Sequence, residues 1–336
     1  MRHRRLGQTG AWVSEIGLGG NTFGRECDQR ATVEIVEAAL ESGINFFDTA
    51  DSVAGGKSEE LLGKAIAPYR HQVVLATKVG WPAGARDPNA EGLSRRRIVS
   101  ALDASLRRLG TDHVDVYYLH HPDAWTPLEE TLAAMDDLVR AGKVRYPACS
   151  NYPAWQVVAM HAACRERSLT APVVSQSPYN LLDVSLESEL VPACRHVGMG
   201  VVAYAPLAGG FLTGKYRRDA PVVAGRRGHN NPSWQRRWMD ERNFRVLDRM
   251  RELALAVGVP VAHVAIAWVL ARPLVSSVLV GARTRDQLLA NVLAADVTLT
   301  DRQHRELGVL REGQLPDDSG VLPGVPAPAA HDILRT

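Results

Sequence analysis

Three ionisable residues each stand directly after a short apolar run of the sequence, and together they could perform acid–base chemistry. They are Asp48, Lys78 and His120. A carboxylate beside an ammonium stabilises both charges, and a nearby imidazole can donate a hydrogen bond to an oxygen atom. Each residue alone has an ordinary structural explanation, as a loop cap, a buried ion pair or a half-buried histidine. Their common position, repeated three times, favours a shared functional site.

The apolar runs before these residues alternate with amphipathic segments along most of the chain. The runs have the length of buried strands, and the segments between them repeat apolar residues at helical spacing. The predicted strands comprise residues 16–18, 44–47, 73–77, 114–119, 144–149, 173–175, 201–203 and 278–280. The predicted helices comprise residues 28–41, 94–109, 128–141, 155–167, 186–197, 243–256, 261–271 and 284–294, with another that begins at Ser58. Strands that alternate with helices predict a parallel sheet of the α/β class.

Eight strand–helix units favour a closed (β/α)8 TIM barrel over an open doubly wound sheet. No GxGxxG motif follows a predicted strand, which also speaks against an open dinucleotide-binding fold. Residues 5–16 predict an N-terminal β-hairpin, and extra helices are expected towards the C-terminus. We expect one domain over residues 1–315, followed by a tail at 316–336 that is rich in Pro, Gly and Ala. Residues 217–231 lack periodicity and predict a mobile loop.

Composition narrows the classes of partner. The 336 residues carry a formal net charge of +2, so neither nucleic acid nor a membrane surface is expected to bind. The four cysteines show no CxxC spacing, so no metal is expected and reduced thiols in a cytoplasmic protein are predicted. No signal-like segment and no apolar run of membrane-spanning length are present. A small-molecule substrate is the expected partner, and the sequence leaves the oligomeric state open.

In a (β/α)8 barrel the carboxyl ends of all strands meet at one face, so the residues that follow the predicted strands should surround a single site. These residues offer a carboxylate, an ammonium, an imidazole, amides and hydroxyls. They are Asn21, Asp48, Lys78, His120, Ser150, Asn151, Gln176, Tyr204 and Gly281. The sequence therefore predicts an acid–base cluster at the mouth of the barrel.

From Leu6 to about Leu310 the sequence resembles the aldo-keto reductase superfamily, in particular its bacterial branch that is similar to the potassium-channel β subunits. The resemblance is carried by RLGQTGAWVSEIGLGG, GINFFDTAD, GKSEELLGKAI, VVLATKVG, SLRRLGTDHVDVYYLHHPD, GKVRYPACSNY, VSQSPYNLLD, YAPLAGGFLTGKY and GARTRDQLLANV. It implies an oxidoreductase that holds NADPH extended across the barrel mouth. It also implies that Asp48, Lys78 and His120 are three members of a catalytic set of Asp, Tyr, Lys and His.

The resemblance further implies which residues hold the cofactor. Ser150, Asn151 and Gln176 match the positions that hold the nicotinamide carboxamide. Arg283 is expected at the 2′-phosphate, which favours NADP over NAD, and Arg285 is an equal candidate. The remaining expected cofactor-binding residues are Gly20, Asn21, Asp48, Tyr204, Ala205, Pro206, Leu207, Gly209, Lys215, Gly281, Gln287 and Asn291.

One position departs from the family pattern. The family carries a tyrosine acid five positions after the aspartate, whereas this chain has Val53 there. Hydride transfer to a carbonyl leaves an alkoxide, and a positioned general acid accelerates such a reaction by about 10²–10⁴-fold. Valine supplies no proton, so either another donor replaces the tyrosine or the reaction needs none at that place.

Three interpretations follow from Val53. In the first, the chain reduces a carbonyl with His120 as the acid and Lys78 tuning the site, assisted by Ser52 or a substrate hydroxyl. In the second, hydride goes to an activated C=N or C=C acceptor that needs no tyrosine. In the third, turnover is weak and the chain is a nicotinamide-binding redox sensor or partner subunit. The retained acid–base residues favour an enzyme.

Other aromatic residues leave the nature of the cleft open. A shifted loop would let another phenol reach the cleft, although two of the candidates lie within a predicted strand; they are Tyr117, Tyr118 and Tyr152. Tryptophans after the predicted strands are either cleft walls or packing residues, and they are Trp81, Trp125, Trp234 and Trp238. His121 stands where relatives commonly carry Arg. The sequence does not specify the substrate.

Overall fold

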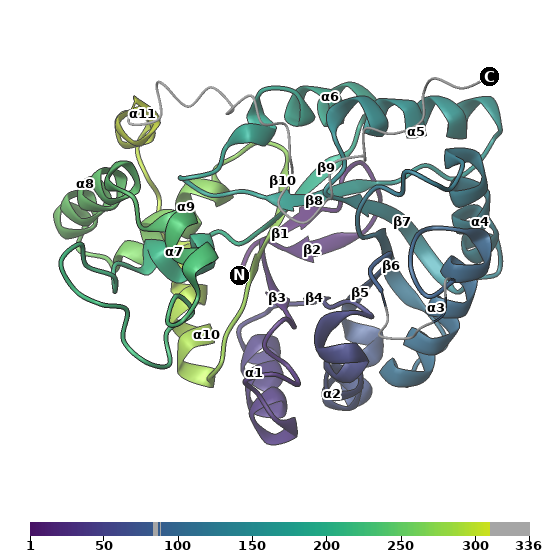
Figure 1. Ribbon diagram of the computed structural model, residues 1–336, viewed down its shortest axis with the longest axis horizontal. Coiled ribbons are helices and arrows are strands. Elements are labelled where there is room, and N and C mark those ends of the chain that lie inside the picture. Colours follow the sequence, from purple (N-terminus) through teal and green to yellow (C-terminus); the bar gives the residue numbers. More distant parts are fainter. Residues whose placement is uncertain (83–86, 88, 310–336) are drawn as a thin grey trace.

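The computed structural model describes residues 1–82, 87 and 89–309, and within these ranges eight strands form one closed parallel barrel (Figure 1). The strands follow one another around the barrel in chain order, and the last pairs with the first. They are β3 (Ile16–Gly19), β4 (Phe46–Asp48), β5 (Val74–Val79), β6 (Val114–Leu119), β7 (Val144–Ser150), β8 (Val174–Pro178), β9 (Gly200–Tyr204) and β10 (Val275–Val280). The predicted (β/α)8 barrel is confirmed. The predicted tail, residues 316–336, lies outside the described residues.

Helices surround the barrel and cover the outer face of the sheet (Figure 1). They are α1 (Gln29–Glu41), α2 (Lys57–Ile66), α3 (Arg95–Leu109), α4 (Leu128–Arg140), α5 (Ala154–Glu166), α6 (Leu190–Val197), α8 (Glu241–Val257), α9 (Val261–Leu270) and α10 (Arg285–Val292), with α7 (Pro232–Trp238) and α11 (Asp301–Val309) in addition. Local sequence explains their ends. The Ser94 side chain accepts a hydrogen bond from the Arg97 backbone and starts α3, which Gly110 ends in the left-handed conformation at φ 65°.

The bounds of several predicted strands and helices differ from the structure by a few residues, and two starting points differ most. The helix predicted over 186–197 begins only at Leu190, because residues 185–187 form a separate 3-10 turn. The strand predicted over 278–280 begins earlier, at Val275, where a register shift against β9 marks an irregularity. Helix α7 was not predicted, because its seven residues carry no apolar repeat long enough to detect.

The predicted N-terminal hairpin is present as the antiparallel strands β1 (His3–Arg5) and β2 (Trp12–Ser14). Leu6 and Val13 from this segment are buried in the same cluster as the side chains inside the barrel. Glu15 is fully buried beside them and forms ion pairs with Arg2 and Arg4. The hairpin therefore packs against the interior of the barrel, as a plug at the end where β3 begins.

Alternation along the strands decides which residues face the interior. Side chains at every second position, such as Phe46, Ala76, Tyr118, Ala148 and Val202, pack inside the barrel. The next inward positions along these strands are polar, and they lie at or just beyond the carboxyl ends. The polar positions are Asp48, Lys78, His120, Ser150, Gln176 and Tyr204. Because side chains alternate along each strand, these six side chains all lie at one mouth of the barrel. They are called the polar layer below.

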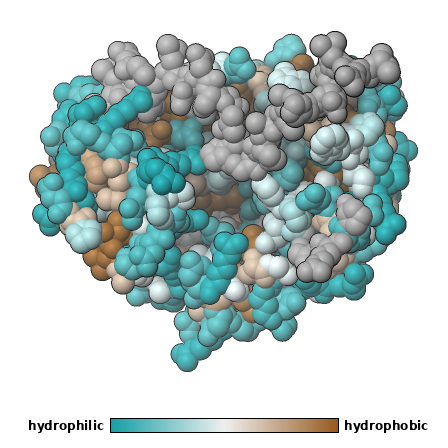
Figure 2. Space-filling view, viewed as in Figure 1, coloured by the Kyte–Doolittle hydropathy of each residue, from teal (hydrophilic) through white to brown (hydrophobic). Residues whose placement is uncertain are grey.

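The surface drawn in Figure 2 is mostly hydrophilic, with hydrophobic residues recessed near its centre. All four cysteines are buried as free thiols. In the part of the chain that the structure describes, no single helix is long and apolar enough to cross a membrane, and the one helix pair of sufficient combined length, α8 with α9, is bent by 95°.

Candidate active site

Asp48 and Lys78 form the centre of the polar layer at the barrel mouth. The Lys78 Nζ donates to Asp48 Oδ1, and it donates a second hydrogen bond of 2.9 Å to the Thr49 carbonyl oxygen. The other Asp48 oxygen accepts a hydrogen bond of 2.9 Å from the Gln176 side-chain amide. Both members of the ion pair are buried, with 5% and 7% of their side chains exposed. Three predicted site residues, from β4, β5 and β8, are thus brought into one network.

Burial changes the acid–base behaviour of Lys78. Loss of solvation lowers its pKa below the usual value, although the Asp48 carboxylate opposes this shift. Two of its three ammonium protons are used, and the third has no hydrogen-bond acceptor among the described residues. The ring of Tyr118 lies beneath the ammonium, with its centroid 5.1 Å from Nζ. One N–H group of the Lys78 ammonium is therefore left in the polar layer without a hydrogen-bond acceptor among the described residues.

His120 stands beside this network as a neutral imidazole. Burial, followed by the charge of Lys78, lowers its pKa to about 2. Its Nδ1 is buried without a hydrogen-bond partner in the described part of the chain. An unpaired acceptor is less costly to bury than an unpaired N–H donor, so we assign the ring proton to Nε2. A neutral imidazole donates a hydrogen bond but is a poor proton donor, so the role of His120 as the acid stays a prediction.

We predict that the His120 ring stays neutral from pH 5 to pH 8, because burial disfavours its charged form and its pKa of about 2 lies far below this range. Nitrogen NMR of selectively labelled histidine measures this directly. A titration of the His120 resonances within the range would contradict the assignment.

The ring of Trp81 packs against the rings of His120 and His121. Trp81 follows β5, and its ring lies 6.2 Å from that of His120 in an edge-to-face arrangement and 4.2 Å from that of His121. The contact was not predictable in detail, because it joins loops from different strands. Trp125 projects outwards and is 94% exposed. Trp234 and Trp238 are buried in the hydrophobic core, which favours the second of the two alternatives for them, packing residues.

Val53 lies in a 3-10 turn, η1 (Val53–Gly56), that follows β4 and precedes α2. Its side chain is partly buried. The next residue, Ala54, has a positive φ of 51°, an unusual conformation for a residue with a Cβ atom. Backbone strain of this kind recurs at the barrel mouth, at Asn151, Ala205 and Ala208.

Of the three other candidate phenols, Tyr117 and Tyr152 lie in the outer core, whereas Tyr118 lies inside the barrel beside Lys78. The Tyr118 hydroxyl is buried without a hydrogen-bond partner in the described residues. Tyr117 points towards the helices and donates to the Ile98 carbonyl oxygen at 3.2 Å. Tyr118 faces the barrel interior, where burial and the Asp48 charge raise its pKa well above the usual value. Tyr152 is 5% exposed and packs in the outer core.

A second hydrogen-bonded group continues the polar layer along β7 and β9. The Asn151 side-chain nitrogen donates to the His120 carbonyl oxygen at 2.9 Å and to the Ser150 hydroxyl at 3.0 Å. The Tyr204 hydroxyl donates to the Asn151 side-chain oxygen at 2.9 Å. Burial raises the pKa of Tyr204 to about 12, so this phenol stays protonated. Ser150, Asn151 and Tyr204 thus form one network next to His120.

The loops after β9 and β10 carry a group of positive charges, Lys215, Arg226 and Arg283, called the basic cluster below. Partial burial, together with Arg283 and Arg226, lowers the pKa of Lys215. The Arg226 side chain donates to the Lys215 carbonyl oxygen, and Arg283 donates to the Gly225 carbonyl oxygen at 2.9 Å. Glu26 forms an ion pair with Arg283 at 3.3 Å. Like charges gathered in this way favour the binding of an anion.

Small residues let the neighbouring loops approach closely. A Cβ atom at Gly281 would lie 2.9 Å from Asn21 Oδ1, and one at Gly20 would lie 2.9 Å from the Ser58 hydroxyl. Gly209 has a positive φ of 64°, in the loop that also contains Ala205, Pro206 and Leu207, and Trp234 packs directly against it. The Gln287 side-chain oxygen accepts from the Arg283 backbone at 3.0 Å. Asn291 is partly buried on α10, and Arg285 lies 3.5 Å from Glu41.

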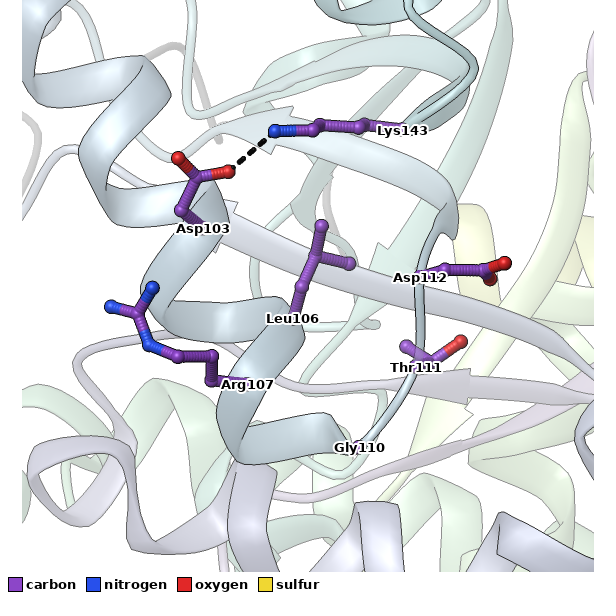
Figure 3. Close-up of a pocket in the computed structure, with 7 residues that line it drawn as sticks. All are labelled: Asp103, Leu106, Arg107, Gly110, Thr111, Asp112 and Lys143. Carbon is purple, nitrogen blue, oxygen red and sulfur yellow. Dashed lines mark hydrogen bonds and ion pairs between the residues drawn. The ribbon is translucent and has the colours of Figure 1, made fainter.

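A shallow depression at the amino-terminal end of the strands lies apart from this site (Figure 3). It is bounded by the residues before β6 and β7, among them Gly110, Thr111 and Lys143. Lys143 forms an ion pair of 2.8 Å with Asp103 across it, as Figure 3 shows. This end of the barrel is opposite to the polar layer, so the depression is not part of the candidate active site.

Comparison with known proteins identifies the family. The Aldo/keto reductase family profile matches residues 15–312. The chain is 38% identical to an uncharacterised oxidoreductase, YrpG, of Bacillus subtilis over 311 residues, which cover 89% of this chain and 92% of that protein. It is 37% identical to a probable voltage-gated potassium channel subunit beta of Oryza sativa subsp. japonica over 303 residues, which cover 88% and 92% of the two chains. With a putative channel subunit of the same kind from Schizosaccharomyces pombe the identity is 36%. The closed barrel and these matches together show that the chain belongs to the aldo/keto reductase family.

Proposed function

We propose that this chain is an NADPH-dependent oxidoreductase that transfers hydride to a carbonyl or to an activated C=N or C=C acceptor. The observation that carries the proposal is the convergence of Asp48, Lys78 and His120 at the mouth of the barrel, beside amides from β7 and β8. In (β/α)8 barrels this face holds the chemistry. Family membership supports the reaction class, an oxidoreductase, and the proposal does not specify which small molecule is reduced.

The residues around the polar layer fit NADPH, a dinucleotide that carries phosphate groups and a nicotinamide carboxamide. The basic cluster gathers three cations with one nearby carboxylate, Glu26, and it lies in the loops after the seventh and eighth barrel strands. Loops at these two places commonly bind phosphate in this fold. The amides of Asn151 and Gln176 lie at the other side of the polar layer, where they would face the nicotinamide carboxamide. NADPH, when bound, supplies the hydride.

The protein residues must then stabilise the oxygen or nitrogen that receives negative charge. His120 donates a hydrogen bond through Nε2 and orients the acceptor atom. Lys78 supplies the proton, because its depressed pKa makes the ammonium a stronger acid and its third N–H group is unassigned. Asp48 holds Lys78 in position through the ion pair. Val53 contributes no proton, so the site is best suited to acceptors that need little assistance from an acid.

Two measurements test the proposal. NADPH fluorescence on titration with the protein measures cofactor binding, with NADH as the matched comparison. A panel of aldehydes, imines and conjugated enones, followed by NADPH oxidation, then identifies the acceptor class. We expect binding of NADPH and turnover with at least one class. Absence of NADPH binding would refute the proposal.

Arg283 is expected to determine the preference for NADPH. Replacement of Arg283 by Ala should raise the Kd for NADPH by about tenfold and leave that for NADH almost unchanged, since a charge-assisted contact to a phosphate contributes about 1.5 kcal/mol. Arg285→Ala is the comparison that separates the two candidates, because the Arg285 side chain pairs with Glu41. Isothermal titration measures both constants. An equal effect on NADPH and NADH would exclude Arg283 from the 2′-phosphate.

A second candidate function is that of a redox sensor or partner subunit with weak turnover. Relatives named as potassium channel β subunits and the aliphatic residue Val53 favour it. Steady-state turnover separates the two candidates. Rapid NADPH oxidation with any acceptor of the panel supports the enzyme, whereas tight NADPH binding without turnover supports the sensor.

A further inference from the structure

A buried ion pair next to the candidate active site is not explained by the chemistry above. Asp51 lies in the loop between Asp48 and Val53, and its Oδ2 is 2.5 Å from Nη2 of Arg97 on α3. Only 2% and 8% of the two side chains are exposed. Burial of two charges costs free energy that an ion pair only partly returns, so such a pair is weak evidence for a role in stability alone.

The pair connects the two loops that frame the polar layer. The Asp51 backbone N–H donates to the Lys78 carbonyl oxygen at 3.3 Å, and Arg97 also donates to the Trp81 carbonyl oxygen at 3.4 Å. Arg97 therefore joins the loop that carries Val53 to the loop that carries Trp81. Since Trp81 packs on the ring of His120, a shift of either loop would reach the candidate catalytic groups.

The hydrogen bonding of the pair is incomplete. Asp51 Oδ1 and Arg97 Nε are both buried without a partner in the described residues. A bidentate arrangement would use both carboxylate oxygens and two guanidinium nitrogens, and it would be the more stable geometry. Here one guanidinium nitrogen serves two acceptors in different loops. Arg97 therefore connects the two loops, and it does so in place of forming the stronger bidentate pair with Asp51.

We propose that Asp51 and Arg97 are positioning residues, which hold the loop of Val53 and the loop of Trp81 in the arrangement that the reaction requires. The proposal rests on the oxidoreductase function proposed above. It assigns to Asp51 a role through its charge, because only the carboxylate pairs with Arg97. Neither residue touches the reacting atoms in this proposal.

The surroundings of Asp51 shift the pKa of its carboxyl group into a pH range in which the protein can be assayed. Burial raises its pKa to about 6, with Glu59 adding to the shift and Arg97 and Arg108 opposing it. The charged and titratable groups that act on it come from four elements, and they are Arg97 and Arg108 of α3, Glu59 of α2, Lys78 of β5 and Tyr117 of β6. Below this pH the carboxyl group is protonated and the ion pair is lost. Activity is therefore expected to fall as the pH drops through about 6.

The test compares wild type with Asp51→Asn in the same acceptor assay from pH 5 to pH 8. Wild type should show an acidic limb in kcat/KM. Asp51→Asn, which resembles the protonated state, should lack the limb and be at least about tenfold slower at pH 7.5, since small displacements of positioned groups cost up to about 10²-fold. Asp103→Asn is the matched control, because it removes a carboxylate from an ion pair at the opposite end of the barrel. A wild-type pH profile in Asp51→Asn would overturn the proposal.

A second readout does not depend on turnover. Hydrogen–deuterium exchange of the peptide 49–57, corrected for the intrinsic effect of pH, should become faster in wild type below pH 6 and be fast at all pH values in Asp51→Asn. If no acceptor is reduced but this exchange pattern is observed, the proposed function fails while the positioning pair stands. If Asp51→Asn does not fold, the wild-type exchange decides alone, and exchange that is independent of pH refutes the pair. Arg97→Lys, which retains the charge without reaching both loops, should give an intermediate exchange rate.

Discussion

Replacement of Lys78 by Met should lower kcat/KM for NADPH-dependent reduction by at least about 10³-fold, since it removes both the proposed proton donor and the cation that balances Asp48. Steady-state NADPH oxidation measures the loss. Methionine preserves the length and the apolar stem of the side chain, so packing around the ring of Tyr118 changes little. The Kd for NADPH should change much less than kcat, because Lys78 acts at the reacting atoms.

The same substitution leaves the Asp48 carboxylate buried without its cation. Removal of one partner from a buried ion pair lowers the free energy of unfolding by about 3–5 kcal/mol. Loss of activity through unfolding must therefore be separated from loss of chemistry. The double variant Asp48→Asn with Lys78→Met removes both charges, so it should recover stability without recovering activity.

Lys143→Met is the surface control for this experiment. Lys143 pairs with Asp103 at the opposite end of the barrel, where both side chains are more than a third exposed. Its loss should change the free energy of unfolding by less than about 1 kcal/mol and leave turnover unchanged. A Lys78→Met protein that is folded and retains more than a tenth of wild-type kcat/KM would contradict the role proposed for Lys78.

The barrel and the convergence of the central residues could be predicted because both depend on local patterns. Asp48, Lys78 and His120 lie two positions beyond inward-facing strand residues, and the period of two along a strand brings them to one side. The strand over 114–119 has the predicted bounds, because it begins and ends with apolar residues and polar residues flank it on both sides. Regular alternation of strands and helices then leaves few topologies to consider.

Contacts between loops could not be predicted from the sequence, since loops carry no periodic pattern of apolar residues. The pair of Asp51 and Arg97 joins residues 46 positions apart, and the packing of Trp81 on His120 depends on the course of two loops. Trp234 illustrates the same limit. Its position after a strand was compatible with a cleft wall and with a packing residue, and its ring fills the space beside Gly209, a glycine with a positive φ of 64°.

Val53→Tyr tests the remaining part of the proposed chemistry. We expect this substitution to raise kcat/KM for a simple aldehyde by about 10²-fold, the lower end of the range for a positioned general acid. Val53 is partly buried in the turn after β4, and by the family resemblance a phenol at this position would reach Lys78. The Lys78 ammonium would lower the pKa of that phenol through its charge and would pair with it through the unassigned N–H group.

Val53→Phe is the control that isolates the hydroxyl group, because it adds the same ring without a proton donor. The ratio of kcat/KM between the tyrosine and phenylalanine variants therefore measures the acid alone, and any effect of the added volume cancels. A ratio near 10² for the aldehyde, together with a ratio near one for an iminium or enone, would show that Val53 suits acceptors that are already activated. A ratio near one for every acceptor would show instead that this barrel obtains its proton without help from position 53, and the shortage of acid inferred from valine would be wrong.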